Sequence, residues 1–298
     1  MPGEAMVTAN GIELCYETFG DPDGEPLLLV MGLGAQLIVW PVELCEGLAD
    51  RGFFVIRYDN RDVGRSTKLE DGPGDFLSSF VAATQGEPVE VPYRLTDLAA
   101  DGAALLEVLG IDSAHIVGAS MGGMIAQAIA IEHPARVRSL TSIMSTTGER
   151  DVGQPTPAAM ERLLTPPPTT RQEAIDSGVD TRRFLGSPDA FDEELARVAI
   201  AESYDRCFYP AGTARQLLAI VASGSRAEGL RQVTVPTLVI HGDIDPLVTP
   251  SGGQRTAELI PGAALLMLEG MGHDLPPAYL GPIVEAITGL AASAAPAA

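Results

Sequence analysis

The sequence predicts an α/β fold, a doubly wound and mostly parallel sheet with a helical insertion. Three observations support this prediction: short apolar runs that end at glycines or charged turns, helical apolar spacing between those runs, and one long stretch where the runs stop. Short apolar runs are typical of parallel strands that are buried on both faces. Their alternation with amphipathic helices is typical of doubly wound sheets.

The first half of the chain alternates regularly between the two patterns. Runs at 26–31 and 52–58 flank a segment with helical spacing, which together predict a β-α-β unit. Gly110 follows a helical segment as a C-terminal cap. The elements expected in this half are strand 26–31, helix 40–51, strand 52–58, helix 95–109, strand 114–118, helix 121–131 and strand 137–144.

The alternation stops near residue 146 and resumes after residue 226. The intervening stretch begins rich in proline and contains no strand pattern. We therefore expect a core in two parts, 1–145 and 227–292, separated by a helical lid at 146–226 and followed by a disordered tail at 293–298. The further elements expected are helices 192–207 and 211–222, strands 235–240 and 264–268, and a final helix 282–292.

The strongest chemical signal is Gly118-Ala119-Ser120-Met121-Gly122, a G-x-S-x-G motif between an expected strand and an expected helix. A sharp strand-to-helix turn exposes the serine hydroxyl, and glycines on both sides remove Cβ atoms that would collide there. The following helix points its positive end at developing negative charge. This context predicts Ser120 as a nucleophile.

A serine nucleophile needs a base and an orienting acid, which follow such a turn in the order acid, then histidine. Asp245 and His273 both come just after expected strands, so they share the sheet edge of Ser120. The other histidines lie in strands or at a helix end, which favours packing or capping. Asp243 and Asp274 are competing acids, but Asp243 suits a turn and Asp274 adjoins the histidine.

The backbone N–H groups of Leu33 and Met121 are the expected oxyanion hole. Met121 follows the nucleophile, and Leu33 lies in the glycine-rich turn after the first buried strand. Gly32 and Gly34 would let that backbone approach closely, although a flexible turn explains the same glycines. A dinucleotide fingerprint is absent, because Leu37 stands where its third glycine belongs.

Together these motifs resemble the α/β-hydrolase superfamily along nearly the whole chain. The resemblance rests on Gly32–Gly34, the 59–66 turn, the Ser120 motif, Asp245 and His273. It implies an α/β-hydrolase fold with an inserted helical lid. It also implies cleavage of carboxylic esters by a Ser-His-Asp triad through an acyl-enzyme, without metal or cofactor.

Two departures from the common pattern resemble a bacterial subgroup of serine carboxylesterases that includes the aclacinomycin methylesterase-like hydrolases. Met31 stands where the family commonly has histidine, and Asp62 replaces the glycine of the common D-x-R-G-x-G-x-S turn. The resemblance does not extend to the lid, so it does not transfer that subgroup's substrate.

Other functions of the same fold remain alternatives. Haloalkane dehalogenases and epoxide hydrolases use an aspartate nucleophile, so Ser120 argues against both. Cofactor-free perhydrolases resembling haloperoxidases share Ser-Met-Gly-Gly but often have an aromatic residue where this chain has Leu33. C–C bond hydrolases share the triad. A non-catalytic binding protein of this fold needs no complete triad, so Ser120, Asp245 and His273 argue against it.

Composition narrows the choice of partners. The chain has 298 residues, 19 basic and 40 acidic side chains, and a formal net charge of −21, which disfavours nucleic acid and anionic membranes. No signal peptide pattern and no apolar run of roughly 18 residues is present, which predicts a cytoplasmic protein without a membrane span. Three dispersed cysteines indicate neither a zinc site nor a disulfide framework, and nothing sets an oligomeric state.

The substrate is expected to be a small, neutral, apolar ester. Residues 150–226 carry nine arginines and eleven acidic residues, so this segment is nearly neutral and most of the acidity belongs to the core. An acidic body disfavours strongly anionic substrates. The candidates for the pocket wall are aromatic: Trp40, Phe184, Tyr204 and Phe208.

Overall fold

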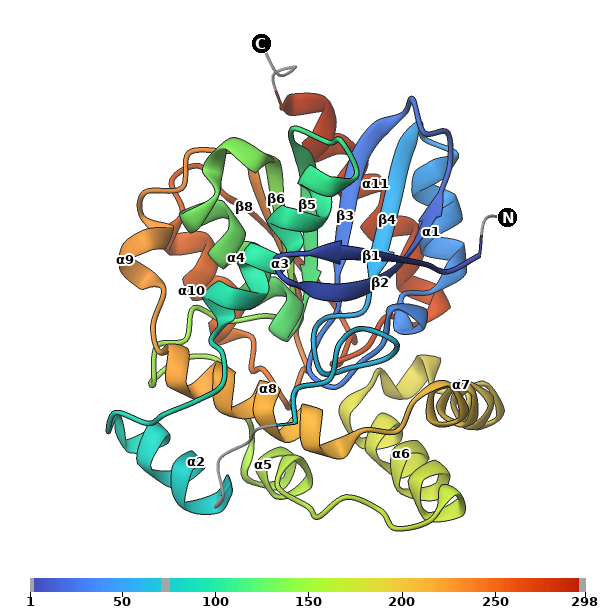
Figure 1. The fold of residues 1–298 in the computed structure, drawn as a ribbon, viewed down its shortest axis with the longest axis vertical. Coiled ribbons are helices and arrows are strands. Elements are labelled where there is room, and N and C mark those ends of the chain that lie inside the picture. Colours follow the sequence, from blue (N-terminus) through green and yellow to red (C-terminus); the bar gives the residue numbers. More distant parts are fainter. Residues whose placement is uncertain (1–2, 71–75, 295–298) are drawn as a thin grey trace.

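An eight-stranded sheet forms the centre of the molecule (Figure 1), in the computed structural model that describes residues 3–70 and 76–294. Its strand order is β1-β2-β4-β3-β5-β6-β7-β8, antiparallel at the β1-β2-β4 edge and parallel from β4 to β8. The strands are β1 Ala5–Ala9, β2 Ile12–Phe19, β3 Glu25–Val30, β4 Phe53–Tyr58, β5 Ala114–Ala119, β6 Val137–Ile143, β7 Thr237–Gly242 and β8 Ala264–Leu268.

Helices cover both faces of the sheet and bury two apolar cores. α3, α4 and α10 pack on one face, and α1 and α11 pack on the other. This confirms the expected doubly wound fold. The helices and short 3-10 turns of these layers are α1 Val42–Ala49, α3 Leu95–Val108, α4 Met121–Glu132, α9 Ala227–Leu230, α10 Ser251–Leu259, α11 Pro277–Ser293, η1 Leu37–Val39 and η2 Pro134–Arg136.

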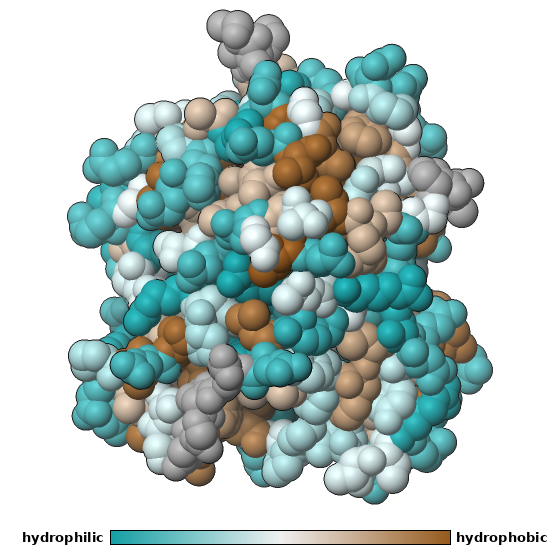
Figure 2. Space-filling view, viewed as in Figure 1, coloured by the Kyte–Doolittle hydropathy of each residue, from teal (hydrophilic) through white to brown (hydrophobic). Residues whose placement is uncertain are grey.

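A second group of helices lies beyond the carboxyl ends of the parallel strands (Figure 1). Figure 2 shows the outline narrowing between this group and the sheet body. The group consists of α2 Phe76–Gln85, α5 Pro157–Leu163, α6 Arg171–Leu185, α7 Glu193–Arg206 and α8 Pro210–Ser223, with the short turn η3 Pro188–Ala190. α7 and α8 match the two helices expected here within two residues at each end. α2 lies outside the expected insertion and packs on α8.

The sequence analysis missed the β1-β2 hairpin. β1 alternates between partly buried and exposed residues and β2 mixes exposed, partly buried and buried ones, so neither has the continuous apolar run of the parallel strands. A local signal was present in Asn10-Gly11, where both residues have positive φ, at 48° and 76°. Asn-Gly is a strong signal for a two-residue hairpin turn. Of the tail expected at 293–298, Ser293 instead ends α11, and 295–298 lie outside the described residues.

Two further findings concern composition. No helix in the described part of the chain has the length and apolar character needed to cross a membrane. Cys15, Cys45 and Cys207 are all free thiols, and the first two are buried.

His115 is a packed residue of β5, as the sequence analysis expected. Its Nδ1 lies 2.8 Å from Ser139 Oγ and its Nε2 lies 3.1 Å from Glu25 Oε2. Burial lowers the pKa of His115; the Glu25 carboxylate opposes this effect, and the Arg138 guanidinium adds to it. The folded protein therefore holds this ring neutral more firmly than the unfolded chain does.

We predict that His115 makes the protein less stable in mild acid. The unfolded chain protonates this histidine near pH 6.5, but the folded chain resists, so stability is full above that pH and falls as pH drops toward the lowered pKa. Denaturant unfolding at pH 7.5 and 5.5 should show a smaller decrease in H115Q than in the parent, by up to about 1.4 kcal/mol per pH unit. H133Q, at the end of α4, is the control; an unchanged decrease in H115Q would contradict the prediction.

Candidate active site

Ser120 sits on a strained turn between β5 and α4. Its φ of 58° and ψ of −121° lie where only glycine is comfortable. A Cβ at Gly118 would lie 2.0 Å from the carbonyl oxygen of Gly122, and a Cβ at Gly122 would lie 1.9 Å from that of Val30. The turn can therefore pack against β3 only with glycine at both positions.

A continuous chain of hydrogen bonds joins the three residues expected at this sheet edge. His273 Nε2 lies 2.9 Å from Ser120 Oγ, and His273 Nδ1 lies 2.6 Å from Asp245 Oδ2. The other oxygen of Asp245 accepts hydrogen bonds from the N–H groups of Leu247 and Val248, at 2.8 and 2.9 Å. These bonds fix the buried carboxylate so that Nδ1 carries the proton and Nε2 is free to accept one.

The two competing acids have other partners. Asp243 Oδ1 accepts a hydrogen bond from Gly270 N at 2.7 Å and braces the turn after β8. Asp274 accepts hydrogen bonds from the N–H and the hydroxyl of Ser187, at 3.0 and 2.7 Å. His273 N donates to Leu185 O at 2.7 Å, so the loop that carries the histidine is tied to the end of α6.

A second histidine lies beside the same carboxylate. His241, in β7, is fully buried; its Nε2 lies 2.7 Å from Val248 O and 3.6 Å from Asp245 Oδ2. Burial lowers the pKa of His241, an effect that the Val248 carbonyl and the Asp245 carboxylate oppose. A neutral ring here leaves the Asp245 charge available to His273.

The loop after β3 passes close to Ser120 and is held by the helices beyond the sheet. A Cβ at Gly32 would lie 3.1 Å from Ser120 Cβ. Gly34 N donates to Gln216 Oε1 at 2.8 Å, while Gln216 Nε2 donates to Arg61 O at 2.8 Å. The buried Gln216 of α8 therefore bridges two loops of the core. The sequence analysis missed it because its partners are more than 150 residues away and no local pattern marks it.

The neighbouring loop explains why Asp62 replaces the common glycine. Asp62 has a φ of 70°, and its carboxylate receives two hydrogen bonds from Arg215 of α8, at 2.8 and 2.9 Å. Tyr93 Oη donates to the same carboxylate at 2.7 Å. This buried ion pair attaches α8 to the core beside the Gln216 bridge.

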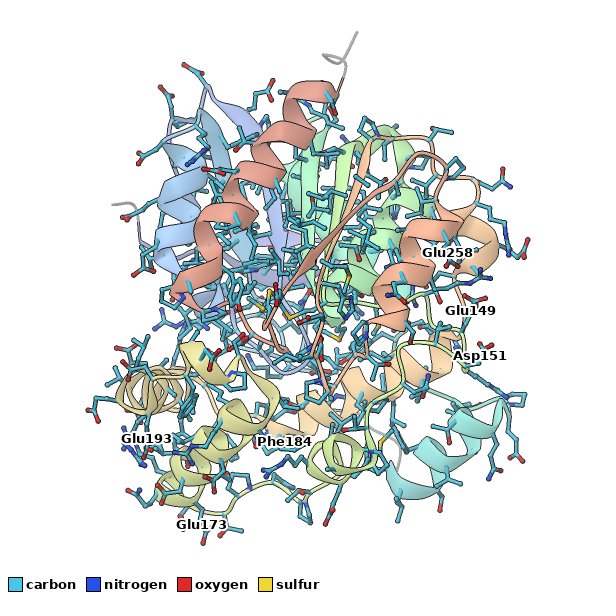
Figure 3. All side chains as sticks on the ribbon, turned by 180° about the vertical axis from the view of Figure 1, so that it is seen from behind. Glu149, Asp151, Glu173, Phe184, Glu193 and Glu258 are labelled. Atoms are coloured by element: carbon cyan, nitrogen blue, oxygen red, sulfur yellow. The ribbon has the colours of Figure 1, made fainter. Side chains whose placement is uncertain are left out.

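We predict that D62N destabilises the protein by about 3–5 kcal/mol, because it leaves the Arg215 guanidinium buried without its counter-charge. Asparagine tolerates positive φ, so backbone strain should contribute little. Denaturant unfolding measures the loss, and the double variant D62N/R215M should recover part of it. D151N, at an exposed aspartate (Figure 3), is the matched control with a loss within about 0.5 kcal/mol. Equal losses in D62N and D151N would contradict the prediction.

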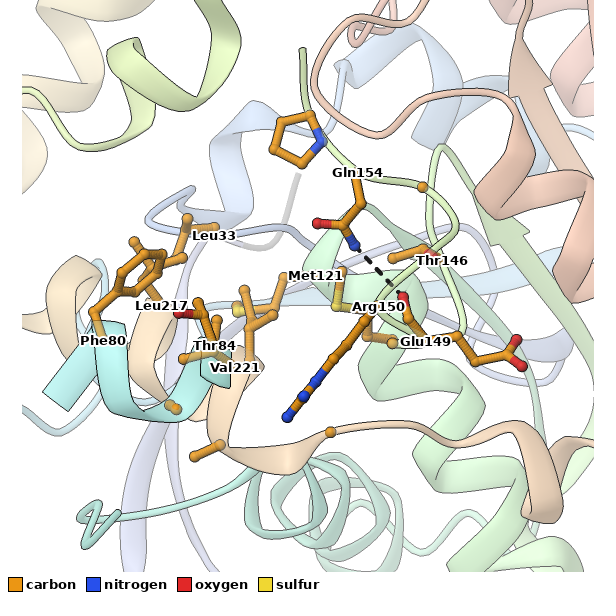
Figure 4. A pocket seen from close by; sticks show the side chains of 18 of the residues that line it. Leu33, Phe80, Thr84, Met121, Thr146, Glu149, Arg150, Gln154, Leu217 and Val221 are labelled. Carbon is orange, nitrogen blue, oxygen red and sulfur yellow. Dashed lines mark hydrogen bonds between the residues drawn. The ribbon is translucent and has the colours of Figure 1, made fainter. Parts of the chain in front are cut away.

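A pocket of about 550 Å³ opens at Ser120 (Figure 4). Ser120, Met121 and Leu33 line it together with apolar side chains of the outer helices, Phe80, Met160, Leu163, Leu217 and Val221. A more polar region includes Glu149, Arg150 and Gln154. Such a space, largely apolar with a few polar groups, fits a small organic molecule. Across residues 3–70 and 76–294, no group of three or more His, Cys, Asp or Glu side chains is arranged to hold a metal ion.

The four aromatic residues expected to line the pocket lie elsewhere. Trp40 is fully buried in the core beneath α1 and α11. Phe184 lies among the outer helices (Figure 3), with the Arg162 guanidinium 4.5 Å from its ring centre. Tyr204 and Phe208 stack on each other with ring centres 4.7 Å apart. Because α2, α5 and α8 form the pocket wall, the expectation for these four residues was wrong.

The sequence of the chain matches the alpha/beta hydrolase fold family over residues 25–276. The chain belongs to this family. Relatives of this alpha/beta hydrolase include Rhodomycin D methylesterase DauP of Streptomyces sp. (strain C5), 33% identical over 95% of this chain and 96% of its own. Another is 3-oxoadipate enol-lactonase 2 of Acinetobacter baylyi, 29% identical over 88% and 87% of the two chains. The expected resemblance to bacterial methylesterases is confirmed.

Solved structures agree with the fold. The alpha/beta hydrolase aligns with a meta-cleavage product hydrolase from Pseudomonas fluorescens IP01 at a TM-score of 0.77 and 20% identity, over 96% of both chains. It aligns with an enol-lactonase from Burkholderia xenovorans LB400 at a TM-score of 0.74 and 23% identity, over 97% and 100%. The expected fold class is confirmed. The sequence relatives, a methylesterase and an enol-lactonase, show that the chain is a hydrolytic enzyme.

Proposed function

We propose that this alpha/beta hydrolase cleaves carboxylic esters, with Ser120 as nucleophile, His273 as general base and Asp245 as the orienting acid. The observation that carries the proposal is the continuous hydrogen-bond path from Asp245 through His273 to Ser120, at the wall of a largely apolar pocket. A nucleophile hydrogen-bonded to a base, which is in turn hydrogen-bonded to an acid that orients it, is the arrangement that activates a serine hydroxyl.

The reaction proceeds in two acyl-transfer steps. His273 Nε2 takes the proton of Ser120 Oγ as that oxygen attacks the ester carbonyl, and Asp245 stabilises the imidazolium that forms. The imidazolium then gives the proton to the leaving alcohol, which leaves an acyl group on Ser120. Water repeats the sequence: His273 takes its proton, and the acid product leaves as the proton returns to Ser120.

The N–H groups of Met121 and Leu33 form the oxyanion hole in this proposal. Met121 is the first residue of α4, where helix N–H groups have no partner within the helix and the dipole favours negative charge. The close approach of Gly32 to Ser120 supports the contribution of the neighbouring Leu33. The close packing that requires Gly118 and Gly122 holds the Ser120 turn against the end of β3, the strand that leads into the Leu33 loop.

The helical segment at 146–226 acts as a lid between the two parts of the core, 1–145 and 227–292. Its α5 and α8 supply much of the pocket wall, which supports control of access by this segment. Two relatives that are 33% identical over 95% of the chain are named as methylesterases, which favours an ester of a small alcohol. Methyl esters are therefore the first natural class to test.

We predict that S120A lowers the hydrolysis of a p-nitrophenyl acyl ester by at least about 10³-fold while the protein stays folded, since the nucleophile is lost. The matched control is S177A, an exposed serine of α6, with unchanged turnover. A fluorophosphonate should label the parent and S177A but not S120A. A folded S120A with near-parent turnover would overturn the assignment, and a parent that neither reacts nor turns over would favour a binding protein.

We predict that Q216L lowers kcat by about tenfold with little change in KM. Losing the Gln216 bond releases Gly34 N, so the loop that carries Leu33 N can shift away from an oxyanion that exists only in the transition state. Steady-state kinetics with p-nitrophenyl esters measures this split.

An inhibition constant separates positioning from a general loss of structure. A boronic acid forms a tetrahedral adduct on serine that resembles the transition state. Q216L should therefore raise its inhibition constant by about the factor by which it lowers kcat. Q172L, at an exposed glutamine of α6, should change neither value. A rise in KM with unchanged kcat and unchanged boronate inhibition would rule out the positioning role.

A further inference from the structure

Arg226 is a partly buried cation whose hydrogen bonds go only to neutral acceptors. Its Nε donates to Gln127 Oε1 at 3.0 Å, its Nη2 donates to Thr146 O at 2.7 Å, and its Nη1 lies 3.5 Å from Gly224 O. A guanidinium has five N–H donors, so these contacts leave two of them unused. Burial alone lowers the pKa of Arg226 to about 10, a value that still leaves it charged at neutral pH.

The four arginines with the least exposed side chains among the ion pairs all have carboxylate partners, whereas Arg226, like Arg182 of α6, is partly buried and has no ion pair in the described chain. Within residues 3–70 and 76–294, the buried pairs are Arg57–Glu17, Arg61–Asp101, Arg206–Asp59 and Arg215–Asp62. A buried charge without a counter-charge costs stability. In the described chain, Arg226 therefore lacks the carboxylate partner that Arg57, Arg61, Arg206 and Arg215 have.

Arg226 lines the same pocket as Ser120. Its partner Gln127 lies in α4, six residues after Met121 at the start of that helix. The rise of an α-helix puts the backbone of Gln127 about 9 Å further along α4 than that of Met121, so the guanidinium bonded to Gln127 is set back from Ser120 along this helix. The pocket volume of about 550 Å³ leaves room for a ligand that reaches both points.

Two more arginines line the pocket, and one of its two acids is paired with an arginine outside the lining. Arg94 and Arg150 join Arg226, and Figure 4 shows the Arg150 side chain pointing away from the Glu149 carboxylate. Glu149 is instead paired with Arg255, at 2.9 and 3.1 Å. The pocket lining contains three arginines and two acids, Glu87 and Glu149. Its positive charges therefore outnumber its negative charges.

We propose that the arginine-lined part of this pocket binds a carboxylate of the substrate, separated from the ester that Ser120 attacks by a length on the order of this 9 Å helix rise. A planar carboxylate fits the two free N–H donors of a guanidinium and supplies the missing counter-charge. The substrate is then an ester with a distal carboxylate, such as a half-ester of a dicarboxylic acid. This inference rests on the proposed ester hydrolysis and departs from the neutral substrate expected from segment charge.

Two p-nitrophenyl esters of equal length test the proposal. Mono-p-nitrophenyl suberate ends in a carboxylate at about this reach, and p-nitrophenyl octanoate ends in a methyl group. The ratio of their kcat/KM values should fall about ten- to a hundred-fold in R226M, because a charge-assisted hydrogen bond to a partly buried arginine is lost. It should fall about two- to fivefold in R150Q, at an exposed arginine. R171Q, whose guanidinium pairs with Asp205 on the outer helices, is the control with an unchanged ratio.

Binding to S120A separates this inference from the proposed function. Calorimetry should show that suberate monomethyl ester binds more tightly than dimethyl suberate, and that R226M or R150Q in this background reduces the difference. If R226M does not fold, the same measurements are made on R226K and R150Q. Equal reduction of both p-nitrophenyl esters would assign Arg226 a structural role and overturn the proposal. Equal binding of the two methyl esters to S120A would also overturn it, whereas a carboxylate preference without any hydrolysis would support the site and reject the esterase.

Discussion

The close contact between the β5–α4 turn and β3 is the constraint on which the rest of the site depends. Gly122 lies so near the carbonyl of Val30 that no side chain fits between them, and Gly118 lies as near to Gly122. This contact fixes the strained backbone of Ser120 at the end of α4. Strain of this kind persists only where surrounding structure determines it, and here the central strands of the sheet do so.

Parallel topology then brings the other groups to Ser120. The loops after β3, β7 and β8 all leave the same edge of the sheet, and they carry Leu33, Asp245 and His273. α8 adds a second level of control, because Gln216 and Arg215 attach it to two of the core loops through buried polar contacts. The wall of the pocket and the backbone beneath it are therefore one connected structure. A change in α8 is therefore expected to act on the chemistry through these loops, without touching the reacting atoms.

The sequence was most informative where function depends on local chain geometry. Ser120 follows from a pentapeptide between a strand and a helix, and Asp245 and His273 follow from their places after strands. The pocket wall could not be read in this way. The aromatic side chains of the insertion pack against arginines or one another, and the wall comes partly from α2, outside the expected lid. Gln216 was invisible for a similar reason, since its role exists only after distant segments meet.

The charge summed over a segment of the sequence likewise differs from the charge that lines the folded pocket. The segment at 150–226 is nearly neutral in total, which suggested a neutral substrate. In the folded chain, many of its charges pair on the outer surface, as Arg171 does with Asp205 and Arg197 with Asp176. These pairs contribute little field at the pocket, because exposed charges are screened. Arg226 is partly buried, lines the cavity and has only neutral hydrogen-bond partners, so in our proposal its charge acts on the substrate. In a protein of charge −21, the local sign at the substrate can therefore be opposite to the sign of the whole.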